Sequence, residues 1–328
     1  MHMSDTAPIT AQLTASADMK CAETTVEDFQ ITDIPAVMRT LGWMEAARIM
    51  QRWFDGEVFV MSPEEKEGGV EVNQIGQEKL FTDLDFEWLS TASEHTGALV
   101  DEFLGKFSST SQYNEIMGRK GRGIDQLTPG LMVFMKRMGK LGILDETKRD
   151  LIAGDHDFSH LDAIGLETAT QINFRSFATG KLDKRNNPLD DVYGTLGGFI
   201  IKVAVTKFST QAKTNNSAAA LNIHEVGCYV RDTYEFLNGS EDQLLGYWSH
   251  LGVVKPNPVE YLFAPEYIER EGVRYFKVTN DSFNCYRAQH RRGGDLFVYS
   301  SVKKVPVSIL IYLSDADFGE FLHRTQRA

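Results

Sequence analysis

The chain has 328 residues, of which 42% are hydrophobic and 24% are charged, so it can bury a full core like an ordinary globular protein. Its net charge of −12 lies almost wholly in residues 1–92, which hold 17 acidic and 6 basic side chains and contribute −11. We therefore do not expect nucleic acid as a partner, because phosphate binding needs concentrated Lys and Arg. The acidic front is either a solvated face or a docking surface for a basic partner.

The N-terminus carries no basic-then-apolar export signal, and no apolar run approaches the roughly 20 residues of a membrane-spanning helix. We expect no transmembrane segment and a cytoplasmic location in the producing cell, with secretion by a route that needs no signal peptide as an alternative. The three cysteines, Cys21, Cys228 and Cys285, have no metal-type spacing and are expected to be free thiols.

The first half of the chain is predicted to be helical. Residues 1–30 are rich in Ser, Thr, Ala and Asp and predict a flexible tail. Residues 31–165 carry apolar side chains mainly at helical spacing and predict a helical domain. A stripe of Met132, Met135 and Met138 on one of its helices is interpreted as adaptable core rather than a ligand-binding surface.

The densest group of potential metal ligands is Asp155–Asp162, which reads D-H-D-F-S-H-L-D. Two histidines and three carboxylates could hold a divalent metal, the one cofactor that we consider, although the sequence assigns none. The preceding Gly154 and the many aspartates favour a surface loop instead, and the HExxH pattern is missing. The favoured interpretation is a loop whose Phe158 packs on the core.

Residues 166–328 predict a β-rich domain with one inserted helix, Asn280–His290. The polar stretch Ser209–Ser217 joins two strands rich in β-branched residues and indicates a hairpin. The predicted fold class is α+β, with a helical N-terminal half and a mostly antiparallel β C-terminal half. The strands are predicted at Thr168–Phe177, Leu196–Phe208, a run from Asn222 onward, Gly272–Thr279, Asp295–Ser300 and Val305–Leu313.

The second hairpin strand ends in polar residues that are candidates for catalysis. Side chains alternate along a strand, so one face is expected to carry His224, Val226, Cys228, Val230, Asp232 and Tyr234. Asp232, Tyr234 and Glu235 are the candidate catalytic residues, because neighbouring carboxylates can bind a divalent ion or perform acid–base chemistry. The alternative is that Asp232 and Glu235 end a strand at the surface while Tyr234 packs.

A compact basic group follows on and after the predicted Asn280–His290 helix. His290 is a further catalytic candidate, and Arg287, Arg291 and Arg292 are candidates for binding a phosphate or carboxylate of a substrate. Trp248 is a further substrate-binding candidate. The alternative for the basic group is a solvated helix end, where cations are favoured.

The acidic and basic groups are expected to face one another across a single cleft. The acidic group stands at the end of a sheet strand, and the helix with the arginines is inserted between two later strands through short connections. Such a cleft could hold a metal-bound or phosphate-bearing ligand. The rival expectation is that the two groups neutralise each other as a salt-bridge network.

Several stretches resemble a family of uncharacterised proteobacterial proteins that are often encoded beside type VI secretion genes. They read L-D-D-V-Y-G-T-L-G-G-F, V-G-C-Y-V-R-D-T-Y-E-F, L-L-G-Y-W and F-N-C-Y-R-A-Q-H-R-R-G-G-D-L, and the resemblance runs from about Phe29 onward. The family carries only a label of unknown function, so the resemblance implies a genomic setting rather than a reaction.

About 60 residues are also similar to the toxin domain of colicin M-like bacteriocins, which are divalent-metal-dependent phosphoesterases. The resemblance matches Asp232, Tyr234 and Glu235 to an Asp-x-Tyr-Asp motif that follows a β-hairpin. The His-Arg pair of that family is missing from Leu237–Leu245, so the same chemistry would need His250 or His290 with its neighbouring arginines.

Two hypotheses from different classes follow. The chain is an antibacterial effector linked to type VI secretion, with a colicin M-like phosphoesterase-type site, or it is a non-enzymatic adaptor or immunity-like binding protein. Both imply a partner from the secretion machinery or from a neighbouring gene. No complete Ser-His-Asp or Cys-His catalytic set can be assembled from the sequence.

Overall fold

The computed structural model describes residues 29–68, 70, 72–119, 127–178, 188–238 and 242–325. The fold is α+β, as predicted, with helices prevailing in the first half and mostly antiparallel strands in the second. The predicted inserted helix is present as α12 (Asn280–His290), between β11 and β12. The predicted tail lies outside the described residues except for its last two, Phe29 and Gln30.

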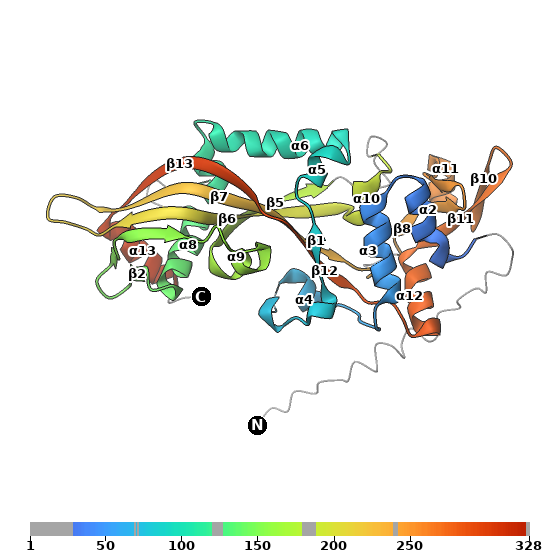
Figure 1. Cartoon of the computed structure of the whole chain (residues 1–328), viewed down its shortest axis with the longest axis horizontal. Helices are drawn as coiled ribbons and strands as arrows, with labels where there is room; N and C mark the ends of the chain where they lie inside the picture. The colour runs from blue at the N-terminus through green and yellow to red at the C-terminus, as the bar shows by residue number, and fades with distance from the viewer. Residues whose placement is uncertain are drawn as a thin grey trace, which may run out of the picture.

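The main sheet has seven strands and is built around a long hairpin of β6 and β7, which runs along much of the elongated molecule (Figure 1). The strand order is β1-β12-β7-β6-β4, while β13 pairs with the first part of β7 and β5 pairs with β6. Within it, β1 and β12 pair in parallel. The strands are β1 (Leu80–Leu84), β4 (Gly154–Asp157), β5 (Gln171–Ala178), β6 (Gly198–Gln211), β7 (Ala219–Tyr234), β12 (Leu296–Ser300) and β13 (Lys303–Leu313).

Two smaller sheets and the helices complete the described part of the chain. One sheet has the order β10-β11-β8-β9, and the other pairs β2 with β3. These strands are β2 (Leu144–Asp145), β3 (Asp150–Leu151), β8 (Leu244–Ser249), β9 (Gly252–Val254), β10 (Tyr267–Arg270) and β11 (Val273–Thr279). Besides α12, the helices are α2 (Ile34–Thr40), α3 (Met44–Asp55), α4 (Pro63–Glu67), α5 (Trp88–Thr91), α6 (Glu94–Gly105), α7 (Gln112–Met117), α8 (Pro129–Lys140), α9 (Ala163–Ala169), α10 (Asp191–Thr195), α11 (Pro258–Phe263) and α13 (Asp315–Thr325).

The hairpin differs from its prediction in its strand bounds, since β6 begins at Gly198 and β7 at Ala219, and in the register of β7. β6 continues to Gln211 instead of stopping at Phe208, because Thr210 is buried and its hydroxyl donates to the Ile152 carbonyl at 2.6 Å. In β7 the pairing skips His224, a β-bulge that reverses the alternation of side chains. The predicted alternation of side chains is therefore confirmed from Val226 to Tyr234. His224 does not share that face and is exposed.

Three apolar clusters cover the main sheet, and each uses side chains from both halves of the chain. The largest packs α6, α7, α8 and α13 against the main sheet, and Figure 1 shows α6 running alongside its long strands. Met135 and Met138 are completely buried within it, which confirms the interpretation of the Met stripe as core. α9 packs in the smallest cluster, with Tyr229, Phe297 and Tyr299. The predicted division into two domains at residue 165 stays a prediction.

The remaining cluster surrounds Trp53 of α3, which is fully buried. Its indole makes edge contacts with Phe236 and Phe283 at ring-centroid distances of 5.0 and 5.4 Å. The backbone turn at Gly293 lies directly against this indole, with a φ of +110°. A Cβ at that position would stand 2.6 Å from the ring, so glycine is needed both for the conformation and for the space. No helix of the described residues has the length and apolarity to span a membrane.

We predict that Gly293→Ala lowers the free energy of unfolding by about 3 kcal/mol, because the new methyl group overlaps the Trp53 indole and the backbone is strained. Gly319→Ala is the matched control. Gly319 lies within helix α13 with open space at its Cβ, so this change should raise stability by about 0.5 kcal/mol. Urea denaturation of both variants checks the pair, and equal effects would contradict the assignment.

Candidate functional site

The candidate site is a cavity of about 450 Å³ at the end of the main sheet where β7 extends beyond β6. The two strands last pair at Ile200 and Arg231, so the following residues of β7 have β12 on one side and no β6 neighbour on the other. The cavity occupies this region and is closed by residues from α10, β8 and α12. It brings together four of the predicted site residues, namely Asp232, Tyr234, Glu235 and Trp248.

Asp232 is the titratable group whose environment is most unusual in this cavity. Its Oδ2 atom is shielded from solvent and has no hydrogen-bond partner within the described structure. Burial raises the pKa of Asp232 to about 8, against the smaller opposing effects of the Thr233 backbone N–H and the Arg231 charge. Negative charge on Glu235 adds to the rise, and Lys66 opposes it. At neutral pH the Asp232 carboxyl is therefore largely protonated and can donate a proton.

Glu235 stands beside Asp232 in the chain but in a different state. Its carboxylate forms an ion pair with the Lys66 amine of α4 and accepts a hydrogen bond from the Leu237 N–H at 2.6 Å. The Glu235 side chain is 11% exposed and the Lys66 side chain 46%, so the ion pair is open to solvent on its Lys66 side. The cavity thus combines a carboxyl of raised pKa with one that forms an ion pair, and carboxyl groups in such different environments suit acid–base chemistry.

Two tyrosines in the cavity are neutral hydrogen-bonding groups. The Tyr234 hydroxyl contacts the Met50 sulfur at 3.5 Å, and the Tyr193 hydroxyl donates to the Leu245 carbonyl at 3.1 Å. Burial raises the pKa of both phenols well above the ordinary value, so neither is poised to lose its proton. Trp248 is 3% exposed and meets Trp43 edge to face, which makes it an apolar wall.

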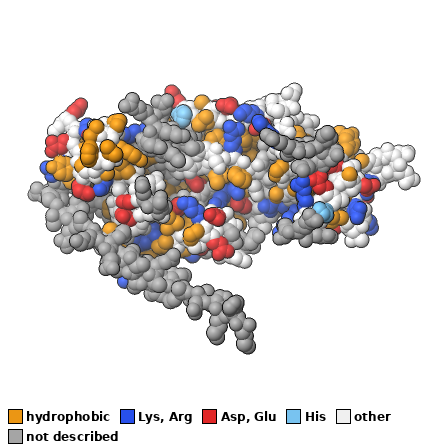
Figure 2. Space-filling model, turned by 180° about the vertical axis from the view of Figure 1, so that it is seen from behind, with side chains coloured by type: hydrophobic (Ala, Val, Ile, Leu, Met, Phe, Trp, Pro, Cys, Tyr) orange, Lys and Arg blue, Asp and Glu red, His pale blue; other side chains and the backbone are white. Residues whose placement is uncertain are grey.

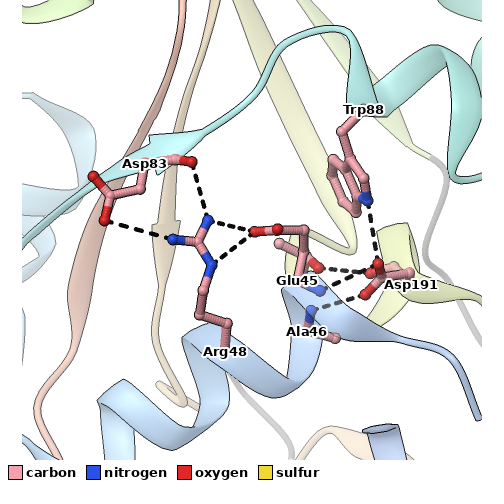
Figure 3. A network of polar contacts seen from close by, with 7 residues as sticks. Glu45, Ala46, Arg48, Asp83, Trp88 and Asp191 are labelled. Atoms are coloured by element: carbon pink, nitrogen blue, oxygen red, sulfur yellow. Dashed lines mark hydrogen bonds and ion pairs between the residues drawn. The ribbon is translucent and has the colours of Figure 1, made fainter.

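The side of the cavity formed by α10 and the turn after it is fixed to α3 through Asp191. The Asp191 carboxylate accepts the backbone N–H groups of Glu45 and Ala46 at 3.2 and 2.8 Å, and the Trp88 indole N–H at 3.1 Å (Figure 3). Asp191 therefore caps the N-terminus of α3 from a distant part of the chain. Gly194 allows α10 to lie this close, because a Cβ there would be 2.7 Å from the Ala46 Cβ.

The predicted basic group does not line this cavity. Arg287 is 2% exposed and forms an ion pair with Asp295, with its guanidinium 5.1 Å from the Trp53 ring centroid. Arg292 donates to the backbone carbonyls of Phe54 and Asp55, which fixes it to the end of α3.

The other two members of the basic group are exposed, as is Arg292. His290 packs its ring against Tyr286, and Arg291 ends α12 in the left-handed conformation. The contacts from Arg287 run through Trp53 to Phe236, which lines the cavity, so aromatic side chains stand between the basic and acidic groups. The expected salt-bridge network between the two groups is wrong, since Glu235 pairs with Lys66 and Arg287 with Asp295.

The predicted Asp155–Asp162 loop is partly a strand. Gly154–Asp157 forms β4 on the edge of the main sheet, because its backbone pairs with β6. His156 lies against Phe208 and shares a hydrogen bond with the Thr210 hydroxyl at 3.0 Å. Asp162 caps α9, and Phe158 packs on the core as predicted. Within the described ranges, no group of three or more His, Cys, Asp or Glu residues could hold a metal ion.

The prediction of three free thiols is wrong for Cys285, which is disulfide-bonded. Cys228 is free and completely buried, and burial raises the pKa of its thiol. Cys21 lies outside the described residues.

Together, these features define an α+β protein with a mainly apolar cavity that holds a carboxyl of raised pKa. The chain matches the family of unknown function DUF6402 over residues 29–314, and it belongs to this family. Comparison with curated proteins and with solved structures found no match. The predicted membership of an uncharacterised family is therefore confirmed, and the family itself supplies no reaction.

We predict that Asp232 makes stability pH-dependent. Its pKa in the folded state, about 8, lies above the unfolded value of about 3.9, so the folded state holds the proton more tightly. Its contribution to the free energy of unfolding is therefore greatest below about pH 4 and falls as the pH rises through about 8. Asp232→Asn should be more stable than the parent protein at pH 9 by on the order of 3 kcal/mol and should remove most of this slope.

The matched control is Asp101→Asn on the exposed surface of α6. Chemical denaturation at several pH values between 4 and 9 should give this variant the same slope as the parent protein. A parent slope that Asp232→Asn leaves unchanged would show that this carboxyl is ionised in the folded protein at neutral pH.

Proposed function

We propose that the cavity at the end of β7 is the active site of an antibacterial effector, in which Asp232 transfers a proton. The observation that carries the proposal is the half-buried Asp232 carboxyl in this cavity, whose Oδ2 is shielded and has no hydrogen-bond partner in the described structure, beside Glu235, which is paired with Lys66. Cavities of this size that combine apolar walls with a few converging polar groups are typical of small-molecule sites. The raised pKa of Asp232, beside a Glu235 that is paired with Lys66, supports general acid chemistry by Asp232.

The substrate of this site is an amphipathic molecule with a bond whose cleavage needs a proton. The apolar walls, among them Met50, Phe236 and Trp248, favour a largely uncharged portion within the cavity. Lys66, already paired with Glu235, is the one cation among the described lining residues. The site therefore favours proton transfer to a leaving group over the binding of a multiply charged group.

A colicin M-like phosphoesterase is the more specific form of the proposal. Its catalytic candidates Asp232, Tyr234 and Glu235 do share one cavity. The donor set fits a divalent ion poorly, because Asp232 is protonated and Glu235 is held by Lys66. We therefore derive no step through a metal.

Delivery by a type VI secretion system, from the cytoplasm of a proteobacterial producer, completes the proposal and is supported by the sequence resemblance alone. The disulfide at Cys285 favours a destination in an oxidising compartment such as a periplasm, because disulfides persist there.

We predict that the protein inhibits growth of a test bacterium when directed to its periplasm and that Asp232→Asn abolishes this effect. The reason is that an amide at position 232 cannot donate the proton and restore it. Asp101→Asn, with the same isosteric change on α6, should remain fully inhibitory at equal protein level. Normal growth with the parent protein in both the periplasm and the cytoplasm would rule out the effector.

A second candidate function is that of a non-enzymatic adaptor or immunity-like binder, and an exposed apolar patch favours it. Figure 2 shows hydrophobic side chains gathered at the end of the molecule that carries α11 and β10. Monomeric proteins rarely expose such groups together, and patches of this kind mark protein interfaces. The apolar patch consists of Val259, Tyr261, Leu262, Phe263 and Tyr267, which are 63%, 50%, 77%, 75% and 47% exposed.

We predict that this apolar patch captures a protein encoded by a neighbouring gene, and that Leu262→Ser with Phe263→Ser weakens capture at least about tenfold. The matched control replaces Leu310 and Tyr312, which are 55% and 65% exposed on β13, with serine. The measurement is a pull-down of the protein products of the neighbouring genes by the parent protein, the patch variant and the control variant. Equal capture by all three would assign binding to another surface, and no capture at micromolar concentration would reject the adaptor function.

A further inference from the structure

A second cavity, of about 1000 Å³, is lined by helices α4, α8 and α9 and by strands β5, β6, β7 and β12 of the main sheet. Strand β6 contributes Ile200 and Lys202 to it, and β7 contributes Arg231. We call this cavity the basic cleft. Its described cationic side chains are Lys66, Lys136, Arg137, Lys140, Lys202 and Arg231.

The charge of the basic cleft is opposite to that of the whole protein. Six cationic side chains and two carboxylates, Glu67 and Glu167, are among the described residues that line it, a surplus of four positive charges. The chain as a whole carries −12. Because concave walls of low dielectric concentrate the field, this surplus raises the local concentration of anions.

Two of these cations are held largely away from water. Arg231 is 8% exposed and donates to the backbone carbonyls of Lys66 at 2.9 Å and Glu65 at 3.4 Å, while its Nε has no partner in the described structure. The Lys202 amine forms a long ion pair with the Glu167 carboxylate, with 3.8 Å between Nζ and Oε1. Burial lowers the pKa of Lys202, and the positive charges of Arg231 and Arg137 lower it further. Cations held together in this way are stabilised by an anion bound between them.

The basic cleft also offers apolar surface to a ligand. Phe174 on β5 is 57% exposed, and the Lys202 amine lies 5.3 Å from the centre of its ring. Val133 and Leu141, on α8 and directly after it, are 39% and 40% exposed. A ligand that fills the basic cleft therefore carries both negative charge and an apolar or planar group.

We propose that the basic cleft binds a soluble organic phosphate, with the phosphates on Lys136, Lys140, Lys202 and Arg231 and a planar group on Phe174. Phosphate groups suit a set of point cations from several elements, because each oxygen accepts from a different donor. The concave shape distinguishes this ligand from a flat membrane surface. The site is separate from the Asp232 cavity except for Lys66, which lines both.

The experiment titrates the purified full chain with pyrophosphate and with ATP at low salt, by calorimetry. We expect saturable binding of both, tighter for ATP because of its planar base, and an affinity that falls as salt is added. Lys136→Gln with Lys140→Gln should weaken binding about tenfold or more. Both lysines are exposed on α8, so this variant should keep its melting temperature.

The matched control is Lys148→Gln with Lys304→Gln, which removes the same charge from exposed positions away from the basic cleft. It should bind ATP as the parent protein does. Lys202→Gln provides an independent variant within the basic cleft and should also weaken binding. If the control pair weakened ATP binding equally, the effect would come from the overall charge of the protein, and the proposal would be overturned.

Two other results would also overturn it. One is the lack of saturable binding of either ligand at concentrations up to about 1 mM. The other is binding to vesicles of anionic phospholipid without binding to pyrophosphate or ATP, which would make the basic cleft a membrane-docking surface.

Discussion

The end of the molecule that holds the Asp232 cavity depends on one buried carboxylate, that of Asp295. Asp295 is 1% exposed and accepts hydrogen bonds from the Trp53 indole N–H at 3.1 Å and the Met61 backbone N–H at 2.9 Å, besides its ion pair with Arg287. These contacts join α3, α12, the segment before α4 and the start of β12. Burial raises the pKa of Asp295, and the Arg287 charge opposes that rise. Removing either partner would leave an uncompensated charge in the core.

The position of the Asp232 cavity follows from this junction. Trp53 is held by Asp295 and packs against Phe236, which in turn stacks on Phe283 with ring centroids 3.7 Å apart. This aromatic stack directs the chain that leaves β7 along the wall of the cavity. The segment from Met61 leads into α4, whose Lys66 reaches Glu235. The two carboxyl groups of the site thus obtain their different environments from elements that the same buried charge positions.

Local patterns were sufficient to predict the fold class and one side of the site. Period-two alternation identified β7 and placed Asp232 and Tyr234 on a buried face, and helical spacing identified the Met stripe. Lys66 could not be predicted, because the polar segment around it gives no sign of a partner as distant as Glu235. The same holds for Asp191, whose role as the cap of α3 depends on a contact between distant segments. Arg287 was predicted to bind a ligand because the sequence shows only its charge. Its burial against Trp53 and its ion pair with Asp295 depend on tertiary packing, which local patterns do not reveal.

Consecutive residues of β7 serve different cavities. Arg231 lines the basic cleft and Asp232 the cavity on the other face, since side chains alternate across a strand. Strand β7 therefore contributes to an anion-attracting cleft and to a mainly apolar cavity, which share Lys66 as a lining residue. A shift of register by one residue would exchange their contents.

The parallel pairing of β1 with β12 has a consequence for how the protein is made. Phe81 lies beside Val298, more than 200 residues later in the sequence. This edge of the sheet cannot form until residues as far as Ser300 have been synthesised, and contacts of such separation slow folding. Meanwhile the apolar sides of α2 and α3 lack their partners on β8, β11 and α12. The newly synthesised chain is therefore exposed to aggregation for longer than a protein of local contacts, and it is a natural client for a chaperone.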